Sequence, residues 1–215
     1  MWVRAIAASA VLLTAIVWSN VGWTRDFLSK LEEGVAREIN LARTDPGQYA
    51  SFLEEWSQYY NDKEIERAGQ PTIITQEGVS AVKEAIRYLR VASSLPLLKI
   101  SIGMSLAAKD HVKELGPAGK LGHKGLTSSW PTDRVSRYGK WKEALGEAIY
   151  YGRDDAREVV MALIIDDGVP SRGHRHHIFD PAFRIVGVAC GPHATYESMC
   201  VITFAGSYIE RTQGQ

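Results

Sequence analysis

The chain has 215 residues, which at roughly 150 residues per domain indicates one domain with a sizeable core. Its 25 basic and 25 acidic residues give a formal net charge of zero, so we expect no nucleic-acid partner. Hydrophobic residues make up 45% and charged residues 23%, which is typical of a folded globular protein and excludes disordered, collagen-like and coiled-coil chains.

The N-terminal residues differ from this average composition. Arg4 precedes the uncharged apolar stretch 5–18, which is shorter than the roughly 20 residues that span a bilayer. Such a stretch is typical of a secretory signal peptide and favours cleavage before Asn20. The alternative is an uncleaved N-terminal anchor, the one membrane attachment that we expect. Residues 1–19 therefore predict a secreted or cell-envelope protein whose single domain spans residues 20–215.

Four helices are predicted from apolar residues that recur every three or four positions. Asn40 and Arg43, late in the first helix, are expected to fasten it to a neighbouring loop. The charged stretch 61–75 contains a Gly-Gln-Pro break and indicates a surface connection. Residues 27–95 thus form an N-terminal helical portion of the domain. The four predicted helices cover residues 26–44, 46–60, 76–94 and 101–115.

The second half of the chain mixes helix and strand. Residues 118–140 show little periodicity and predict a loop, whereas residues 141–150 predict a strand. A helix follows over residues 154–166, with Asp154 or Asp155 as its N-cap, and then a histidine-rich loop. This order predicts an α+β fold in which helices cover both faces of a small antiparallel sheet.

The two cysteines lie in apolar runs that alternate as strands do. If these runs pair antiparallel with Cys190 opposite Cys200, then Val188 meets Ile202, so one register buries both apolar faces and aligns the thiols. A disulfide in so short a loop would contribute roughly 2–3 kcal/mol and would persist in an exported protein. Two buried free thiols are the alternative.

Several motifs of common enzymes are absent, including the nucleophile elbow, the zinc-protease helix, the phosphate loop and the dinucleotide-binding glycine motif. What remains is a set of histidines and acids, namely His123, Glu147 and His174. Neutral imidazoles and carboxylates are the ligand set of a zinc site, in which water fills an open position. The alternatives are structural, such as pairing of Glu147 with Arg175 or Lys124.

A family resemblance is strongest in residues 171–188. This segment reads SRGHRHHIFDPAFRIVGV and resembles the Gly-His-Arg-x-x-Ile-x-x-Pro-x-Phe-x-x-Val-Gly-Val signature of the CAP superfamily, the cysteine-rich secretory, antigen 5 and pathogenesis-related class 1 proteins. NLAR at 40–43 is similar to the Asn-x-x-Arg of the family's first helix, and LAAKDH at 106–111 resembles the helix before its first histidine. The order agrees over residues 32–207, as in a bacterial-type member with one CAP (SCP) domain.

The resemblance implies an α-β-α sandwich with an open cleft, where two histidines and two acids bind a divalent metal, with zinc the first candidate. By position, His123 matches the first histidine, Glu147 the acid of the family's Gly-Glu-Asn, and His174 the second histidine. The remaining acid ends the helix before the second histidine in the family. Asp166 is our choice for it, and Asp167 is the alternative.

The other histidines have structural interpretations. His111 lies on an amphipathic helix and is expected to be structural, and His193 lies between the cysteines and is expected to be exposed. His176 and His177 are expected to be solvated loop residues. Metal ligation is the alternative for His177, because it would lie one helical turn from His174.

Three functions are consistent with the sequence. We favour an exported, monomeric CAP-domain protein, more a binding protein than an enzyme, whose cleft takes a divalent metal and a small or lipidic ligand. The second is a hydrolase in which a metal-bound water or Glu147 as general base attacks a peptide bond. The third is a structural or interaction module of the cell envelope. Five aromatic residues could line a ligand groove, although packing in the core and on the surface is the favoured interpretation; they are Tyr59, Tyr60, Trp130, Tyr138 and Trp141.

Overall fold

The computed structural model describes residues 27–211 as helices on both faces of a four-stranded sheet. The helices are α1 Lys30–Thr44, α2 Pro46–Ser57, α3 Val79–Val91, α4 Ile102–Leu115, α5 Pro131–Tyr138, α6 Ala156–Ile165 and α7 Gly173–Phe179. The strands are β1 Tyr60–Asn61, β2 Glu64–Ile65, β3 Ile73–Ile74, β4 Lys99–Ile100, β5 Gly139–Gly152, β6 Ile185–His193 and β7 Glu197–Glu210.

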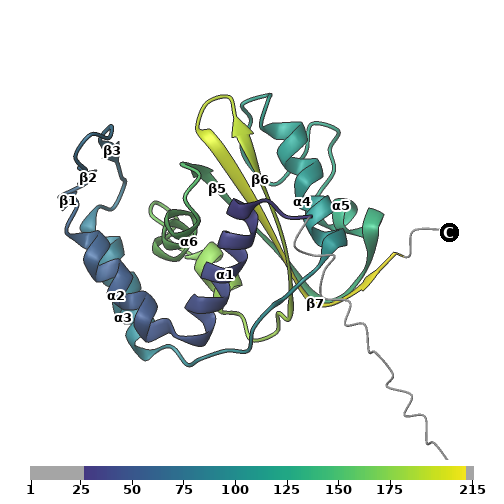
Figure 1. Cartoon of the computed structure of the whole chain (residues 1–215), viewed down its shortest axis with the longest axis horizontal. Helices are drawn as coiled ribbons and strands as arrows, with labels where there is room; N and C mark the ends of the chain where they lie inside the picture. Colours follow the sequence, from purple (N-terminus) through teal and green to yellow (C-terminus); the bar gives the residue numbers. More distant parts are fainter. Residues whose placement is uncertain (1–26, 212–215) are drawn as a thin grey trace, which may run out of the picture.

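The main sheet has the order β4-β6-β7-β5, so that β5 forms one of its edges (Figure 1). The largest core cluster joins one face of this sheet to α1, α6 and α7, and two smaller clusters join the other face to α4 and α5. The α+β class and the α-β-α sandwich are therefore confirmed. Every buried hydrophobic side chain of the described chain lies between Leu28 and Ala205.

Helix starts follow local sequence. Ser29 and Glu32 form a capping box that begins α1, because each side chain accepts the other residue's backbone N–H. The Asp45 carboxylate accepts the N–H of Gln48 ahead of α2, whose first residue is proline. Asp155 caps α6, as expected. The helices predicted from apolar periodicity are all present, with ends that differ by a few residues.

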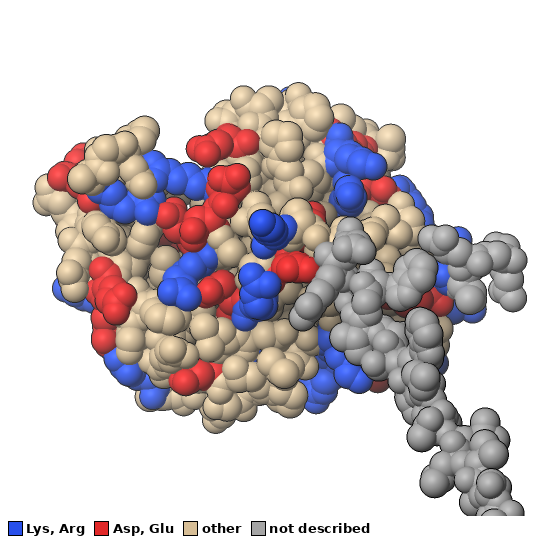
Figure 2. All heavy atoms as spheres, viewed as in Figure 1, with Lys and Arg blue, Asp and Glu red and all other residues tan. Residues whose placement is uncertain are grey.

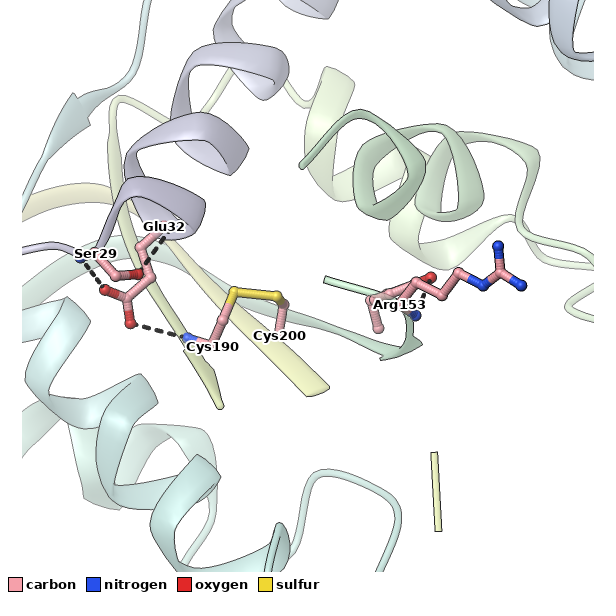
Figure 3. Close-up of a disulfide and its surroundings, with 6 residues drawn as sticks. Ser29, Glu32, Arg153, Cys190 and Cys200 are labelled. Carbon is pink, nitrogen blue, oxygen red and sulfur yellow. Dashed lines mark hydrogen bonds between the residues drawn. A yellow bond between two sulfur atoms is a disulfide. The ribbon is translucent and has the colours of Figure 1, made fainter. Parts of the chain in front are cut away.

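The cysteine hairpin has the expected register. Cys190 and Cys200 form a disulfide, and Val188 lies opposite Ile202. The Glu32 carboxylate accepts the N–H of Cys190 at 3.0 Å, which ties the start of α1 to β6 (Figure 3). The hairpin is therefore fixed both across its strands and to the helical layer above it.

The strands differ from the predictions in two ways. Residues 61–75 are a largely exposed surface connection, as expected, but they contain strands of the small antiparallel sheet β1-β2-β3, which stands apart from the main sheet beyond α6 (Figure 1). The main sheet is also not wholly antiparallel, since β4 pairs parallel with β6. Strands of two residues carry too few side chains to show an alternating pattern, and tertiary packing forms them instead.

Two helices were missed in segments predicted to be loops. α5 lies within residues 118–140, and its start has Pro131 at the first position and an Asp133 carboxylate that accepts the N–H of Trp130. α7 forms in the histidine-rich segment without a side-chain cap. Both helices are too short to show a full apolar stripe.

The predicted signal peptide, residues 1–19, lies outside the described residues. Within residues 27–211, each helix is too short or too polar to cross a lipid bilayer.

Loss of the disulfide should destabilise the domain without changing its fold. We expect the Cys190→Ala/Cys200→Ala variant to lose about 2–3 kcal/mol of unfolding free energy in urea, because the closed loop restricts the unfolded chain. A reductant should lower the stability of the parent by a similar amount and leave the variant unchanged. Equal stability of the oxidised and reduced parent would contradict this.

Candidate functional site

A buried ion pair lies at the edge of the main sheet. Glu147 belongs to β5, and its side chain faces the layer of α4 and α5. Arg134 of α5 donates to both carboxylate oxygens, at 3.0 and 2.7 Å. The two side chains are only 1% and 2% exposed. A charge pair this deep is tolerated because each charge is hydrogen-bonded by the other.

The same arginine positions His123. Arg134 also donates to the backbone oxygen of His123 at 3.1 Å, while His123 Nδ1 lies 2.9 Å from Glu147 Oε1. The preceding Gly122 has a φ of +99°, which favours glycine, and its N–H donates to the Tyr151 hydroxyl. The imidazole, with its side chain 43% exposed, is thus held at its backbone and at one ring nitrogen.

Asp166 is the acid that contacts the second histidine. It ends α6 in a left-handed conformation, and its Oδ1 lies 2.7 Å from His174 Nδ1. Its other oxygen accepts the N–H of His174 at 2.9 Å. The Asp167 carboxylate instead accepts the N–H groups of Gln76 and Glu77, at 2.6 and 2.8 Å. Of the two candidate acids, Asp166 therefore forms the pair with His174.

Two further arginines hold the turn between α6 and α7. Arg172 donates to both oxygens of Glu77, and these hydrogen bonds lower the pKa of that carboxyl to about 2. Arg175, almost fully buried, donates to Glu84 and to the carbonyl of Ile164 at the end of α6. The pairing of Glu147 with Arg175 or Lys124 is not seen. Glu77, just before α3, and Glu84 of α3 thus fix the turn that carries Asp166 and His174.

The two histidine–acid pairs open into different hollows. His123 and Glu147 line a cavity of about 460 Å³ with Trp130, Pro131 and Leu145. His174 and Asp166 line a groove of about 820 Å³ that lies between the small sheet, α6 and the end of β5. Nowhere in residues 27–211 do three or more His, Cys, Asp or Glu side chains come close enough to share a metal ion.

His177 is not the solvated residue that we expected. Its ring packs edge-on against Phe183 and lines the same cavity as His123. A Cβ at Gly146 would lie 3.0 Å from its Nδ1, so glycine permits this approach. Burial lowers the pKa of His177, and the charges of His174 and His123 lower it further. His177 therefore shares the cavity of His123.

The remaining histidines are structural or exposed. His111 is buried, with Nε2 2.8 Å from the carbonyl of Gly122, as a structural role predicts. The expectation for His193 was wrong, because it is 4% exposed and its Nε2 lies 3.0 Å from the Lys120 carbonyl. A residue at a hairpin end is expected to be exposed, and the sequence does not show that the loop with Lys120 packs over His193. His176 is exposed, as expected.

Sequence reasoning missed Arg134, the residue that organises the first pair. It lies in a segment without apolar periodicity. The Pro131 and Asp133 start signals could have placed it on the first turn of a helix. Its partner Glu147 could not have been assigned, because the two residues meet only through tertiary packing.

Comparison with known proteins now identifies the family. The model of the cysteine-rich secretory protein family, CAP, matches residues 83–204. The chain belongs to the CAP family. No curated protein sequence matches the chain.

Three solved bacterial structures are similar to this CAP domain. An outer surface protein of Borrelia burgdorferi is 21% identical with a TM-score of 0.44, over 52% of this chain and 78% of that one. An extracellular SCP-domain protein of Bacillus anthracis is 20% identical with a TM-score of 0.42, and a cysteine-rich secretory protein of Staphylococcus aureus is 12% identical with a TM-score of 0.35. The last two matches cover 59% of this chain and only 37% of each of those chains.

Replacing Arg134 should lower the unfolding free energy far more than a surface substitution does. We expect Arg134→Met to lose about 3–5 kcal/mol of unfolding free energy, because Glu147 would be left buried without its charge partner. The double variant Arg134→Met/Glu147→Leu should recover much of this loss in urea unfolding. If the double variant is no more stable than Arg134→Met, the loss of unfolding free energy does not come from the unpaired carboxylate of Glu147.

Stability should fall at mildly acidic pH. Burial, aided by the charge of Arg134, lowers the pKa of His111 below its ordinary 6.5. The unfolded chain then binds more protons than the folded one, so the unfolding free energy decreases as the pH falls through 6.5. Urea unfolding at several pH values measures how steeply the unfolding free energy depends on pH. This dependence should be weaker in His111→Gln and unchanged in the exposed control His176→Gln. The same pH dependence in the parent and in His111→Gln would contradict the prediction.

Proposed function

We propose that this CAP-domain protein binds a divalent metal through the Nε2 atoms of His123 and His174. The observation that carries the proposal is shared by both residues: a buried carboxylate lies within hydrogen-bond distance of Nδ1. A carboxylate in that position fixes the ring and the tautomer and leaves Nε2 as the acceptor, which is the arrangement found around metal-binding histidines. Imidazole ligands suit zinc and similar metals.

The two acids then act as orienting partners. Glu147 is engaged by Arg134 at both oxygens, and Asp166 holds the ring and the backbone of His174. We place both histidines on one ion because residues of β5 line both the cavity of His123 and the groove of His174. Water would complete the coordination. Ligation by all four sequence-predicted residues remains a prediction.

The proposal includes export to the cell envelope or the exterior. The apolar stretch 5–18 and the Cys190–Cys200 disulfide support it. A small or lipidic ligand beside the metal and a monomeric state stay expectations. The alternative hydrolase is less well supported, because the Glu147 side chain is 2% exposed and paired with Arg134, so it is not open to a substrate water.

Zinc titration by calorimetry tests the metal site. The chain from Asn20 onward retains the whole described core and should show saturable one-site binding, which His123→Ala/His174→Ala abolishes. Asp166→Asn should bind about 10–100-fold more weakly, because the ring of His174 loses its orienting partner. His176→Ala serves as the control and should bind as the parent does. Absence of binding in the parent would overturn the proposal.

A further inference from the structure

β3 is an edge strand of the small sheet, and its outer edge is unprotected. It pairs with β2 on one side only, and residues 72–75 line the groove beside His174. The run 70–76 reads QPTIITQ and carries no charge, while Ile73 and Ile74 are 38% and 70% exposed. Edge strands are normally blunted by charged residues, because their unpaired backbone groups can pair with another chain.

The register shows which backbone groups are unpaired. Thr75 donates its N–H to the carbonyl of Lys63 at 2.8 Å, and Ile73 lies opposite Ile65. Hydrogen-bonded and non-bonded pairs alternate in antiparallel sheets, so the N–H and C=O of Ile74 point away from β2. Outside the strand pairing, no backbone hydrogen bond of residues 27–211 involves Ile74.

This edge borders the groove. The next outward residue in the alternation is Gln76, and its N–H donates to Asp167 at 2.6 Å. Asp167 follows α6, whose residues form the floor of the groove. In Figure 2 the lobe of the small sheet is separated from the main body by a notch at the upper edge. A ligand in this notch could therefore hydrogen-bond to the backbone N–H and C=O of Ile74.

The groove is preformed and largely apolar. Its volume of about 820 Å³ lies in the range of ligand sites. Arg67 lies over the ring of Trp56 and pairs with Glu158 of α6, which fixes the small sheet relative to the floor. Residues of β5 and α6 that also line the groove include Ile149, Tyr150, Met161 and Ile165.

We propose that the groove binds an extended peptide, which adds as a strand to β3 and places alternate apolar side chains on the groove floor. Main-chain hydrogen bonds to β3 would provide affinity. Contacts with the apolar floor would provide specificity, as in other cases of strand addition. An edge that borders a groove favours a single extended segment over a second folded copy of this chain. The inference goes beyond the metal site, and the walls from residues 56–75 precede the family match at 83–204.

A displayed heptapeptide library, selected on the chain from Asn20 onward in the presence of EDTA, tests the proposal. We expect selected peptides to carry apolar side chains at alternate positions. One is then synthesised, and its binding is measured by fluorescence polarisation. N-methylation of the two amides that face β3 should weaken binding about tenfold or more, since each net hydrogen bond contributes about fivefold. Because EDTA removes divalent metal ions, peptide binding is measured independently of the zinc binding that the titration tests.

Variants of β3 supply the matched comparison. Ile74→Pro removes only the outward N–H, and Ile74→Lys adds a charge at the exposed edge, so each should weaken peptide binding at least tenfold. Leu97→Lys, at a residue 61% exposed elsewhere, should bind as the parent does. Unchanged thermal unfolding shows that the variants fold. The proposal is overturned if no selected peptide responds to Ile74→Pro, or if sedimentation shows a dimer that this variant abolishes.

Discussion

The architecture depends on guanidinium groups buried under its loops. Arg43, Arg134 and Arg175 are at most 2% exposed. A buried guanidinium presents five N–H donors that must be satisfied, so it draws backbone carbonyls and carboxylates together. Arg43 donates to the carbonyl of Ile178 in the last turn of α7 and to that of Phe183 beyond its end. Burial lowers its pKa to about 10, helped by the charge of a neighbouring arginine, and it remains charged at neutral pH.

The same constraint explains how His123, in a loop, and His174, at the start of α7, are held in place. Arg134 joins the carboxylate of Glu147 to the backbone of His123, so that a strand and a loop share one cation. Arg175 donates hydrogen bonds to the last two carbonyls of α6, directly before Asp166. Each histidine then needs only its own carboxylate to fix the ring. The charge that positions the site is thus buried, while the imidazoles remain partly exposed.

Local patterns explain the parts of the structure that sequence could predict. The pairing of Cys190 with Cys200 follows from alternation in two strands long enough to show it, and the long helices follow from their apolar stripes. α5, α7 and β1–β3 are too short for such patterns. The order of the family motif was enough to select Asp166, His174, His123 and Glu147 as candidates. It could not show that each acid pairs with one histidine.

Neighbouring acids connect the histidine site to the groove. Asp166 holds His174, whereas the next residue, Asp167, binds the N–H groups that continue the edge of β3. A ligand on His174 and a peptide on β3 would therefore act on one rigid turn, whose position Arg172 also fixes through Asp166 and Glu77. If either ligand shifts this turn, its effect on the other is reciprocal by thermodynamic linkage. This turn is thus a physical means of coupling the proposed metal site in the family segment to a groove wall that precedes it.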